Sequence, residues 1–213
     1  MSASDGVGAR VVQTAGPVLI IGSGLLGASL GLALRAGGVR VYLEDASPTS
    51  LRLASDVGAG QAFGDVLAEA GVCPNDCGSD RPSYKAPSIV VVATPPDVAD
   101  RVIVESLLRF PDAIVTDVAS VKDAVVADVL RGLEREDRLE AASRYVGSHP
   151  MAGRERSGAG AADADLFYGR PWVIVAHEST WPRAVLVARA LATDVGAVPL
   201  EMNSGTHDHA VAL

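Results

Sequence analysis

The sequence predicts an α/β fold in which a doubly wound, mainly parallel β-sheet carries helices on both faces. Short apolar runs alternate with helical segments along most of the 213 residues, as in βαβ units. Hydrophobic residues make up 48% of the chain and aromatic residues only 4%, so we expect an aliphatic core. The 22 glycines allow the many tight turns that this alternation needs.

The runs expected to form strands are rich in β-branched residues, and each of the first four leads into a segment of helical character. In chain order, these strand and helix pairs are 18–21 with 24–38, 39–44 with 47–60, 88–94 with 95–110, and 113–118 with 120–133. Further strands are expected at 144–148, 171–176 and 197–202, with a helix at about 181–194. The intervening segment 61–87 is expected to hold a helix or short strand and then a surface loop. The regular alternation predicts a parallel sheet.

A glycine-rich stretch follows the first expected strand. Gly22, Gly24 and Gly27 form a GxGxxG pattern between that strand and the next helix. The first glycine allows the turn, the second lets the backbone approach a pyrophosphate, and the third lets the helix pack on the strand. Amides at the helix N-terminus then face the phosphate charge. The pattern predicts a Rossmann-type dinucleotide site, although glycines also serve tight turns that bind no ligand.

The second expected strand ends in an acid. Asp45 lies close to the spacing of about twenty residues at which an acid binds the ribose hydroxyls. Glu44 is the neighbouring candidate, and Asp45 also suits a cap for the turn that follows. No Arg or Lys follows until Arg52, so no obvious basic side chain would receive a 2′-phosphate, which favours NAD over NADP. The residues expected to contact the cofactor are Gly22, Ser23, Gly24, Leu25, Leu26, Gly27, Asp45, Ala93, Thr94 and Pro95.

Charge and composition exclude some partners. The formal net charge of −8 argues against nucleic acid or an anionic membrane surface as the main partner. The uncharged span between Arg10 and Arg35 is long enough for a membrane helix or a signal peptide, but glycines interrupt it. A strand that turns into a buried helix explains the same hydropathy. Cys73 and Cys77 fit neither a disulfide framework nor a complete metal site, so we expect reduced thiols, no metal and a cytoplasmic protein.

Two other stretches place polar residues where expected strands end. Thr94, in VVVATPPD, lies at the carboxyl edge of the sheet, where open α/β sheets bind ligands, and the prolines after it also suit a helix start. In VTDVASVKD, the Ser120 hydroxyl and the Lys122 ammonium are placed to face a polar or anionic substrate. The spacing of Ser120 from Asp123 also fits a capping box, and a helix N-terminus can serve both purposes.

A histidine follows the strand expected at 144–148. His149 then lies on the same sheet edge as Gly22, Thr94 and Ser120. Histidine accepts or donates a proton near neutral pH, so beside a nicotinamide it could take a hydroxyl proton while hydride leaves the carbinol carbon. A partly buried structural histidine fits the position equally well.

Five motifs together resemble the prephenate dehydrogenase family, which includes arogenate dehydrogenases. They are IIGSGLLGASL (20–30), DVASVKD (117–123), GSHPMAGRERSG (147–158), ADLFYGRPWVI (164–174) and SGTHDHAVAL (204–213). The His-Pro-Met-Ala-Gly and Leu-Phe-x-x-Arg-Pro-Trp blocks are specific to this group within the dinucleotide-binding dehydrogenases. The resemblance implies NAD-dependent oxidative decarboxylation of prephenate to 4-hydroxyphenylpyruvate, a step of tyrosine biosynthesis.

The resemblance also implies roles for individual residues. His149 would hydrogen-bond the C4 hydroxyl of the substrate and assist its deprotonation. Ser120 would contact that hydroxyl and help orient His149 or the nicotinamide. Lys122 would support the site and the bound substrate from the same helix, and Glu155 would belong to a polar network over the active site. His207 matches a family position near the substrate pocket.

Residues 1–16, rich in Ser, Gly and Ala, are expected to form a flexible tail. A dinucleotide-binding domain is expected at 17–202, and the resemblance implies the start of a helical second domain at 203–213. Within that last segment, His207 and His209 point to different helix faces, so at most one faces the pocket. Family members continue into a helical domain that dimerises and contributes an arginine for a prephenate carboxylate. We therefore expect a homodimer for the full-length protein, and poor or no turnover by this stretch alone.

Two other functions stay open on the sequence. One is another NAD(P)-linked reductase of related architecture that acts on a different hydroxy acid or imine. The other is a non-catalytic module that binds a nucleotide. The sequence does not distinguish prephenate from arogenate as the substrate.

Overall fold

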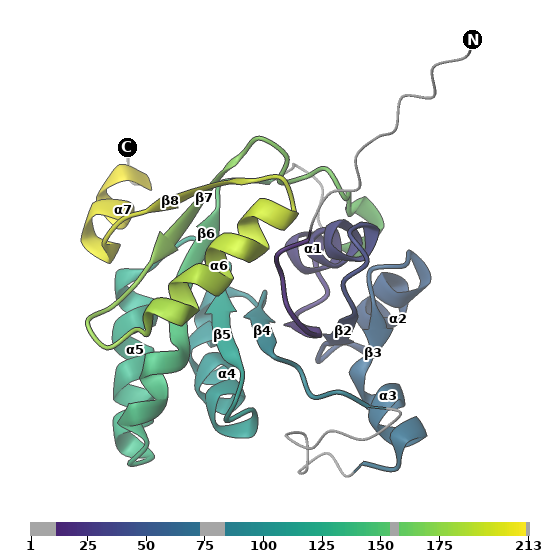
Figure 1. Cartoon of the computed structure of the whole chain (residues 1–213), viewed down its shortest axis with the longest axis horizontal. Coiled ribbons are helices and arrows are strands. Elements are labelled where there is room, and N and C mark those ends of the chain that lie inside the picture. The colour runs from purple at the N-terminus through teal and green to yellow at the C-terminus, as the bar shows by residue number, and fades with distance from the viewer. Residues whose placement is uncertain (1–11, 73–83, 154–157, 212–213) are drawn as a thin grey trace.

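The computed structural model describes residues 12–72, 84–153 and 158–211. It confirms the expected α/β fold, because eight strands form one sheet with helices on both faces (Figure 1). None of the helices in these ranges is long and apolar enough to cross a membrane. Cys73 and Cys77 lie outside the described residues, so the expectation about their thiols stays a prediction.

The sheet is parallel over most of its width. Its strands are β1 (Val18–Ile21), β2 (Val41–Glu44), β3 (Gln61–Ala62), β4 (Ile89–Val92), β5 (Ile114–Asp117), β6 (Tyr145–Pro150), β7 (Pro171–Val175) and β8 (Val198–Glu201). Their order is β3-β2-β1-β4-β5-β6-β7-β8. Strands β1 to β6 run parallel, whereas β7 is antiparallel to β6 and parallel to β8. The carboxyl ends of β1, β4, β5 and β6 therefore meet at one edge.

Helices cover both faces of this sheet. They are α1 (Leu25–Ala36), α2 (Pro48–Asp56), α3 (Phe63–Ala70), α4 (Pro96–Arg109), α5 (Asp123–Arg135), α6 (Pro182–Asp194) and α7 (Ser204–Val211), with short 3₁₀ turns η1 (Leu139–Arg144) and η2 (Ala159–Ala161). Pro48, Pro96 and Pro182 open three of the helices, where the missing N–H has no partner to lose. The helices that sequence periodicity predicted are present, and the segment after residue 60 holds both a short strand and a helix.

Alternate residues of the strands belong to two apolar clusters, one on each face of the sheet. Val18 and Ile20 of β1 pack with residues of α1 and α6, whereas Leu19 packs with residues of α3, α4 and α5 on the opposite face. Every residue of β4 is buried, as is usual for a parallel strand that is covered on both sides. Each buried Val, Leu or Ile side chain contributes roughly 1.5–3 kcal/mol relative to full exposure, so the two clusters supply much of the stability of the sheet.

Part of the segment expected to be a flexible tail forms hydrogen bonds to α6. The backbone amides of Gln13 and Thr14 donate to the carboxylate of Asp194 at the end of α6, at 3.0 Å and 2.6 Å. Residues 1–11 lie outside the described residues. The amides of Gln13 and Thr14 thus bind a buried carboxylate near the other end of the chain, and the flexibility expected for 1–16 stays a prediction.

Strand β6 runs further than the expected 144–148. It pairs with β5 at Tyr145 and Val146, and β7 pairs with it from Gly147 to Pro150. His149 therefore lies within the strand, opposite Val173, rather than in a loop after it. Backbone pairing with β7 therefore fixes the position of the His149 backbone, from which its side chain extends.

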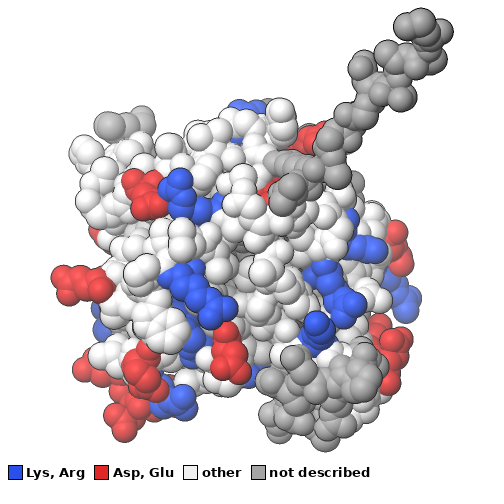
Figure 2. Space-filling model, viewed as in Figure 1, with Lys and Arg blue, Asp and Glu red and all other residues white. Residues whose placement is uncertain are grey.

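Charged side chains are interspersed on the surface. Figure 2 shows Lys, Arg, Asp and Glu side chains among larger uncharged areas on one face of the molecule. Among the described residues of that face, basic side chains do not merge into one continuous patch.

Candidate active site

The turn after β1 needs glycine at two positions. Gly22 has a φ of +104°, and a Cβ there would lie 2.5 Å from the carbonyl oxygen of Ala93. A Cβ on Gly27 would lie 1.9 Å from the carbonyl oxygen of Gly22, so only glycine lets α1 pack this closely on the turn. A Cβ on Gly24 would meet nothing within 4 Å. The space above Gly24 is therefore open, as the approach of a phosphate to the backbone requires.

This turn borders a cavity of about 860 Å³ at the carboxyl ends of β1, β2 and β4. Of the residues expected to contact a cofactor, those that line the cavity are Gly22, Gly24, Leu25, Leu26, Asp45, Ala93, Thr94 and Pro95. The hydroxyl groups of Ser23 and Thr94 are buried without a hydrogen-bond partner in the protein. Thr94 lines the cavity, so its unpaired hydroxyl suits a polar ligand that would supply the missing hydrogen bond.

Asp45, directly after β2, links the glycine turn to the end of that strand. One of its carboxylate oxygens accepts a hydrogen bond from the Ser23 amide at 2.5 Å, and the other accepts one from the Ser47 amide at 2.7 Å. Each carboxylate oxygen can accept more than one hydrogen bond, so ribose hydroxyls remain possible partners. The expected cap of the following turn and the expected ribose site thus coincide in one side chain.

Sequence spacing missed a basic residue at the same cavity. Arg109, at the end of α4, lines the cavity and forms an ion pair with Glu44 at 2.9 Å. Its guanidinium also lies over the ring of Phe110, 4.9 Å from the ring centroid. Arg109 lies far from Asp45 in sequence, so only the fold brings it to the end of β2.

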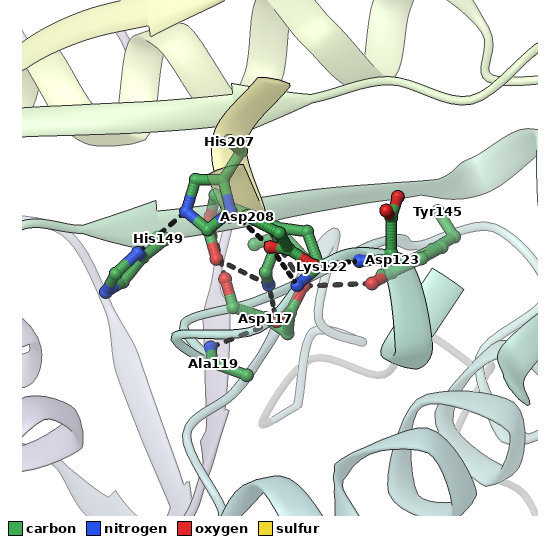
Figure 3. Close-up of polar contacts among 10 residues, drawn as sticks. Asp117, Ala119, Lys122, Asp123, Tyr145, His149, His207 and Asp208 are labelled. Atoms are coloured by element: carbon green, nitrogen blue, oxygen red, sulfur yellow. Dashed lines mark hydrogen bonds and ion pairs between the residues drawn. The ribbon is translucent and has the colours of Figure 1, made fainter. Parts of the chain in front are cut away.

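The second half of the site surrounds His149. This half-buried residue accepts or donates a hydrogen bond through Nδ1 to Nε2 of the fully buried His207 in α7, at 2.9 Å. The rings meet edge to face, with centroids 5.1 Å apart. The other ring nitrogen of His149 points away from the cluster (Figure 3). His209 is exposed, which confirms that the two histidines of α7 face different ways.

Asp208, next to His207, connects α7 to the start of α5. Its carboxylate lies 2.6 Å from Nδ1 of His207 and accepts hydrogen bonds from the backbone amides of Lys122 and Asp123, each at 2.9 Å. Burial raises the pKa of Asp208, but hydrogen bonds from the Asp123 amide, His207 and the Lys122 amide outweigh burial and lower it overall. Asp208 is therefore ionised at neutral pH.

A buried ion pair supports the strand that carries His149. The Lys122 ammonium and the Asp117 carboxylate are both fully buried and contact each other. Asp117 also accepts hydrogen bonds from the Tyr145 hydroxyl and the Ala119 amide, each at 3.0 Å, while Lys122 donates to the Ser148 carbonyl at 2.8 Å. Figure 3 shows this network beneath His149 and α7. The pair thereby links the end of β5 to β6.

The environment of His149 favours its neutral form. Burial, the neighbouring His207 and the Lys122 ammonium lower its pKa from 6.5 to about 4, against smaller opposing effects of the carboxylates of Asp117 and Asp208. At neutral pH the ring is uncharged, so one nitrogen carries a lone pair. A histidine in this state can accept a proton from a bound hydroxyl.

Comparison with known proteins shows the family of this chain. The model of the family described as "Prephenate dehydrogenase, nucleotide-binding domain" matches residues 30–201. The chain belongs to the prephenate dehydrogenase family. A probable prephenate dehydrogenase of Streptomyces niveus is 36% identical over 202 residues, which are 92% of this chain and 47% of that protein. A prephenate dehydrogenase of Bacillus subtilis is 28% identical and is covered to the same 47%, so the chain spans about half the length of these relatives.

Solved structures of prephenate dehydrogenases share the fold. The Aquifex aeolicus enzyme, solved with hydroxyphenyl propionate and NAD+, matches with a TM-score of 0.75 and 25% identity over 93% of this chain and 64% of its own. An arogenate dehydrogenase of Synechocystis matches with a TM-score of 0.73 and 25% identity over 92% of this chain and 63% of its own. The Rossmann-like arrangement expected from the glycine pattern is confirmed by these matches.

The structure corrects two sequence interpretations of the family motif DVASVKD. Lys122 was expected to face a polar or anionic substrate, but its side chain has no exposed surface because Asp117 and the Ser148 carbonyl hold its ammonium inside. Ser120 was also a candidate helix cap. It is exposed and α5 begins at Asp123, where Asp208 binds the first amides instead. Glu155 lies outside the described residues, so its role stays a prediction.

Sequence reasoning missed Asp117 and Asp208 as members of the site. Both lie inside motifs that carry the prephenate dehydrogenase resemblance, Asp117 at the start of DVASVKD and Asp208 directly after His207. An acid beside a histidine, or five residues before a lysine, is a signal that could have drawn attention to them. Their contacts are long range, however: Asp208 binds the Lys122 amide 86 positions away, and Asp117 binds the Tyr145 hydroxyl 28 positions away, which spacing alone does not reveal.

Proposed function

We propose that the protein carrying this chain is an NAD-dependent prephenate dehydrogenase, which converts prephenate into 4-hydroxyphenylpyruvate and carbon dioxide in tyrosine biosynthesis. The observation that carries the proposal is the position of a neutral His149 on the sheet edge that also holds the glycine turn and Thr94. A proton acceptor and a dinucleotide cavity at one edge suit a hydroxyl oxidation. Membership of the family supports the choice of substrate.

The residues around the cavity fit a dinucleotide. The open space at Gly24 leaves room for a pyrophosphate beside the amides that begin α1, and Asp45 is placed for ribose hydroxyls. The unpaired hydroxyl of Thr94, which lines the cavity, offers a further polar contact. When bound, NAD would supply the hydride acceptor. We propose NAD rather than NADP because Glu44 already pairs with Arg109, the basic side chain identified at the cavity.

The chain's own contribution to the reaction would be a proton acceptor in a fixed place. His149 would accept the proton of the substrate C4 hydroxyl while hydride leaves the same carbon, and the ring carboxylate would depart as carbon dioxide. Formation of the aromatic ring drives the reaction, so alignment of the reactants is the main requirement. Ser120, exposed at the start of the α5 region, is proposed to contact the same hydroxyl.

Replacing Gly24 with valine is expected to weaken NAD binding by about tenfold or more, which corresponds to about 1.4 kcal/mol. The new side chain would fill the open space where the pyrophosphate is proposed to lie, and the φ of −72° at this position suits any residue. Isothermal titration with NAD measures the effect. Gly64 in α3 also has open space around it but lies outside the cavity lining, so Gly64→Val is the matched control. If both variants bind NAD with equal affinity, the glycine turn is not part of the cofactor site.

The rate is expected to stay independent of His149 protonation until unusually low pH. Because the pKa of His149 is lowered to about 4, its neutral form predominates above that pH, and kcat/KM should fall on the acid side near pH 4 rather than near 6.5. The groups that set this value are His207, Lys122, Asp117 and Asp208. An NMR titration of the His149 ring checks the same value without substrate. A midpoint near 6.5 would contradict the described environment.

Arogenate is the second candidate substrate, because an arogenate dehydrogenase is among the matching structures. The test is to assay the protein at its natural length for NADH formation with prephenate and with arogenate side by side. Faster turnover of prephenate supports the proposal, and faster turnover of arogenate replaces it. If neither substrate gives NADH, both candidate activities are refuted, and a module that only binds a nucleotide is favoured. Homodimer formation, a helical domain from residue 203 and a cytoplasmic location stay predictions.

A further inference from the structure

We propose that His207 and Asp208 are positioning residues that hold His149 in one tautomer, with the proton on Nδ1 and the lone pair on Nε2. This role deepens the proposed function and rests on it, although the tautomer itself is a property of the free protein. Three side chains form a continuous hydrogen-bond chain from Asp208 through His207 to His149 (Figure 3). The proposal follows from which atoms in this chain can donate.

This series of hydrogen bonds begins at Asp208, whose carboxylate oxygens can only accept hydrogen bonds. The Asp208 carboxylate accepts hydrogen bonds from the first two backbone amides at α5, those of Lys122 and Asp123. An ionised carboxylate has no proton to give, so Nδ1 of His207, 2.6 Å away, must be the donor. We take the His207 ring as neutral in this proposal, and its Nε2 is then left as an acceptor.

The same reasoning determines the tautomer of His149. Its Nδ1 lies 2.9 Å from Nε2 of His207, and a hydrogen bond between them needs one proton. Because His207 Nε2 accepts, His149 Nδ1 must donate, and the neutral His149 ring keeps its lone pair on Nε2. His207 is fully buried, so bulk water does not compete for these contacts. The nitrogen that points away from the cluster is thus the basic one (Figure 3).

The backbone makes this arrangement stiff. His149 is held in β6 by pairing opposite Val173, and Asp208 is fixed by two amides of a different element. A histidine whose second nitrogen is bound in this way has both its ring orientation and its tautomer set. Without Asp208, either ring of the histidine pair could donate to the other, and part of the His149 population would carry its proton on Nε2.

The first measurement is ¹⁵N NMR of the histidine rings in the protein at its natural length near neutral pH. The His149 signals are assigned from their loss in His149→Asn, and we expect a protonated Nδ1 and an unprotonated Nε2. In Asp208→Asn, we expect the two His149 signals to move towards each other as the tautomers mix. A protonated Nε2 in the unchanged protein would overturn the proposal. This readout needs no substrate, so it separates failure of the positioning role from failure of the proposed function.

The second measurement is steady-state kinetics of a matched pair, His207→Leu and His207→Gln. Both keep Asp208, so neither removes the hydrogen bonds that its carboxylate accepts from the Lys122 and Asp123 amides at the start of α5. The leucine variant should lower kcat about 10- to 100-fold with KM and NAD affinity little changed, as for other residues that orient a reactive histidine. The glutamine variant, whose amide oxygen can accept from His149 Nδ1, should recover part of that loss. His209→Gln, at an exposed position of α7, should match the unchanged protein. Equal kcat for the leucine, glutamine and unchanged proteins would overturn the positioning role.

Discussion

Replacing His149 with asparagine is expected to lower kcat by about 10²- to 10⁴-fold, the usual contribution of a general base. The asparagine amide can still donate towards His207 in place of Nδ1, but the chain then has no group at the position of Nε2. NADH formation at saturating prephenate measures the loss. NAD affinity should stay unchanged, because His149 does not line the nucleotide cavity.

The control for this variant is His209→Asn, which makes the same change at an exposed position of α7. It should keep the kcat of the unchanged protein. Thermal unfolding of both variants shows whether the fold is intact, and we expect only small shifts because neither residue belongs to the apolar clusters. A His149→Asn protein that retains more than about a tenth of the unchanged kcat would show that this residue is not the base.

Replacing Lys122 with methionine is expected to destabilise the protein by about 3–5 kcal/mol, the typical effect of removing one partner of a buried ion pair. Asp117 would stay inside the protein as an uncompensated charge, although it keeps the hydrogen bonds from Tyr145 and Ala119. Urea unfolding followed by circular dichroism measures the change. The double variant Lys122→Met with Asp117→Asn should recover part of the loss, because it removes the buried charge as well.

The exposed pair of Arg189 and Glu201 provides the comparison. Their side chains are 46% and 52% exposed and lie 2.6 Å apart, so Arg189→Met should change the free energy of unfolding by less than about 1 kcal/mol. If Lys122→Met cost no more than Arg189→Met, the ammonium of Lys122 would not be buried against Asp117. Such a result would restore the sequence-based expectation that Lys122 faces a substrate.

Most of the fold could be predicted from the sequence because its signals are local. The β-branched runs and the proline-led helices carry their own periodicity, and the glycine turn after β1 has a steric cause within a few residues. The reversal between β6 and β7 was not predicted. The described residues of the connection between these strands, 151–153 and 158–170, contain no long helix, but a sequence pattern of that kind leaves strand direction open.

The candidate site was predicted less completely because its contacts are long range. His149 and His207 were both identified, but their direct contact joins strand and helix 58 residues apart. Lys122 was misjudged because charge alone suggests exposure, whereas a partner at the end of β5 makes burial favourable. The capping role of Ser120 was wrong because Asp208 binds the amides that a local cap would have served.

The way in which α5 begins has a consequence for the order of events during synthesis. The carboxylate that binds its first amides comes from a residue 85 positions after Asp123, and so leaves the ribosome long after the helix itself. Both apolar clusters can assemble before that residue emerges, since neither contains a member of α7. We expect the nucleotide cavity to mature early and the imidazole of His149 to gain its partner late. A nascent chain would therefore acquire cofactor affinity before it acquires a competent base.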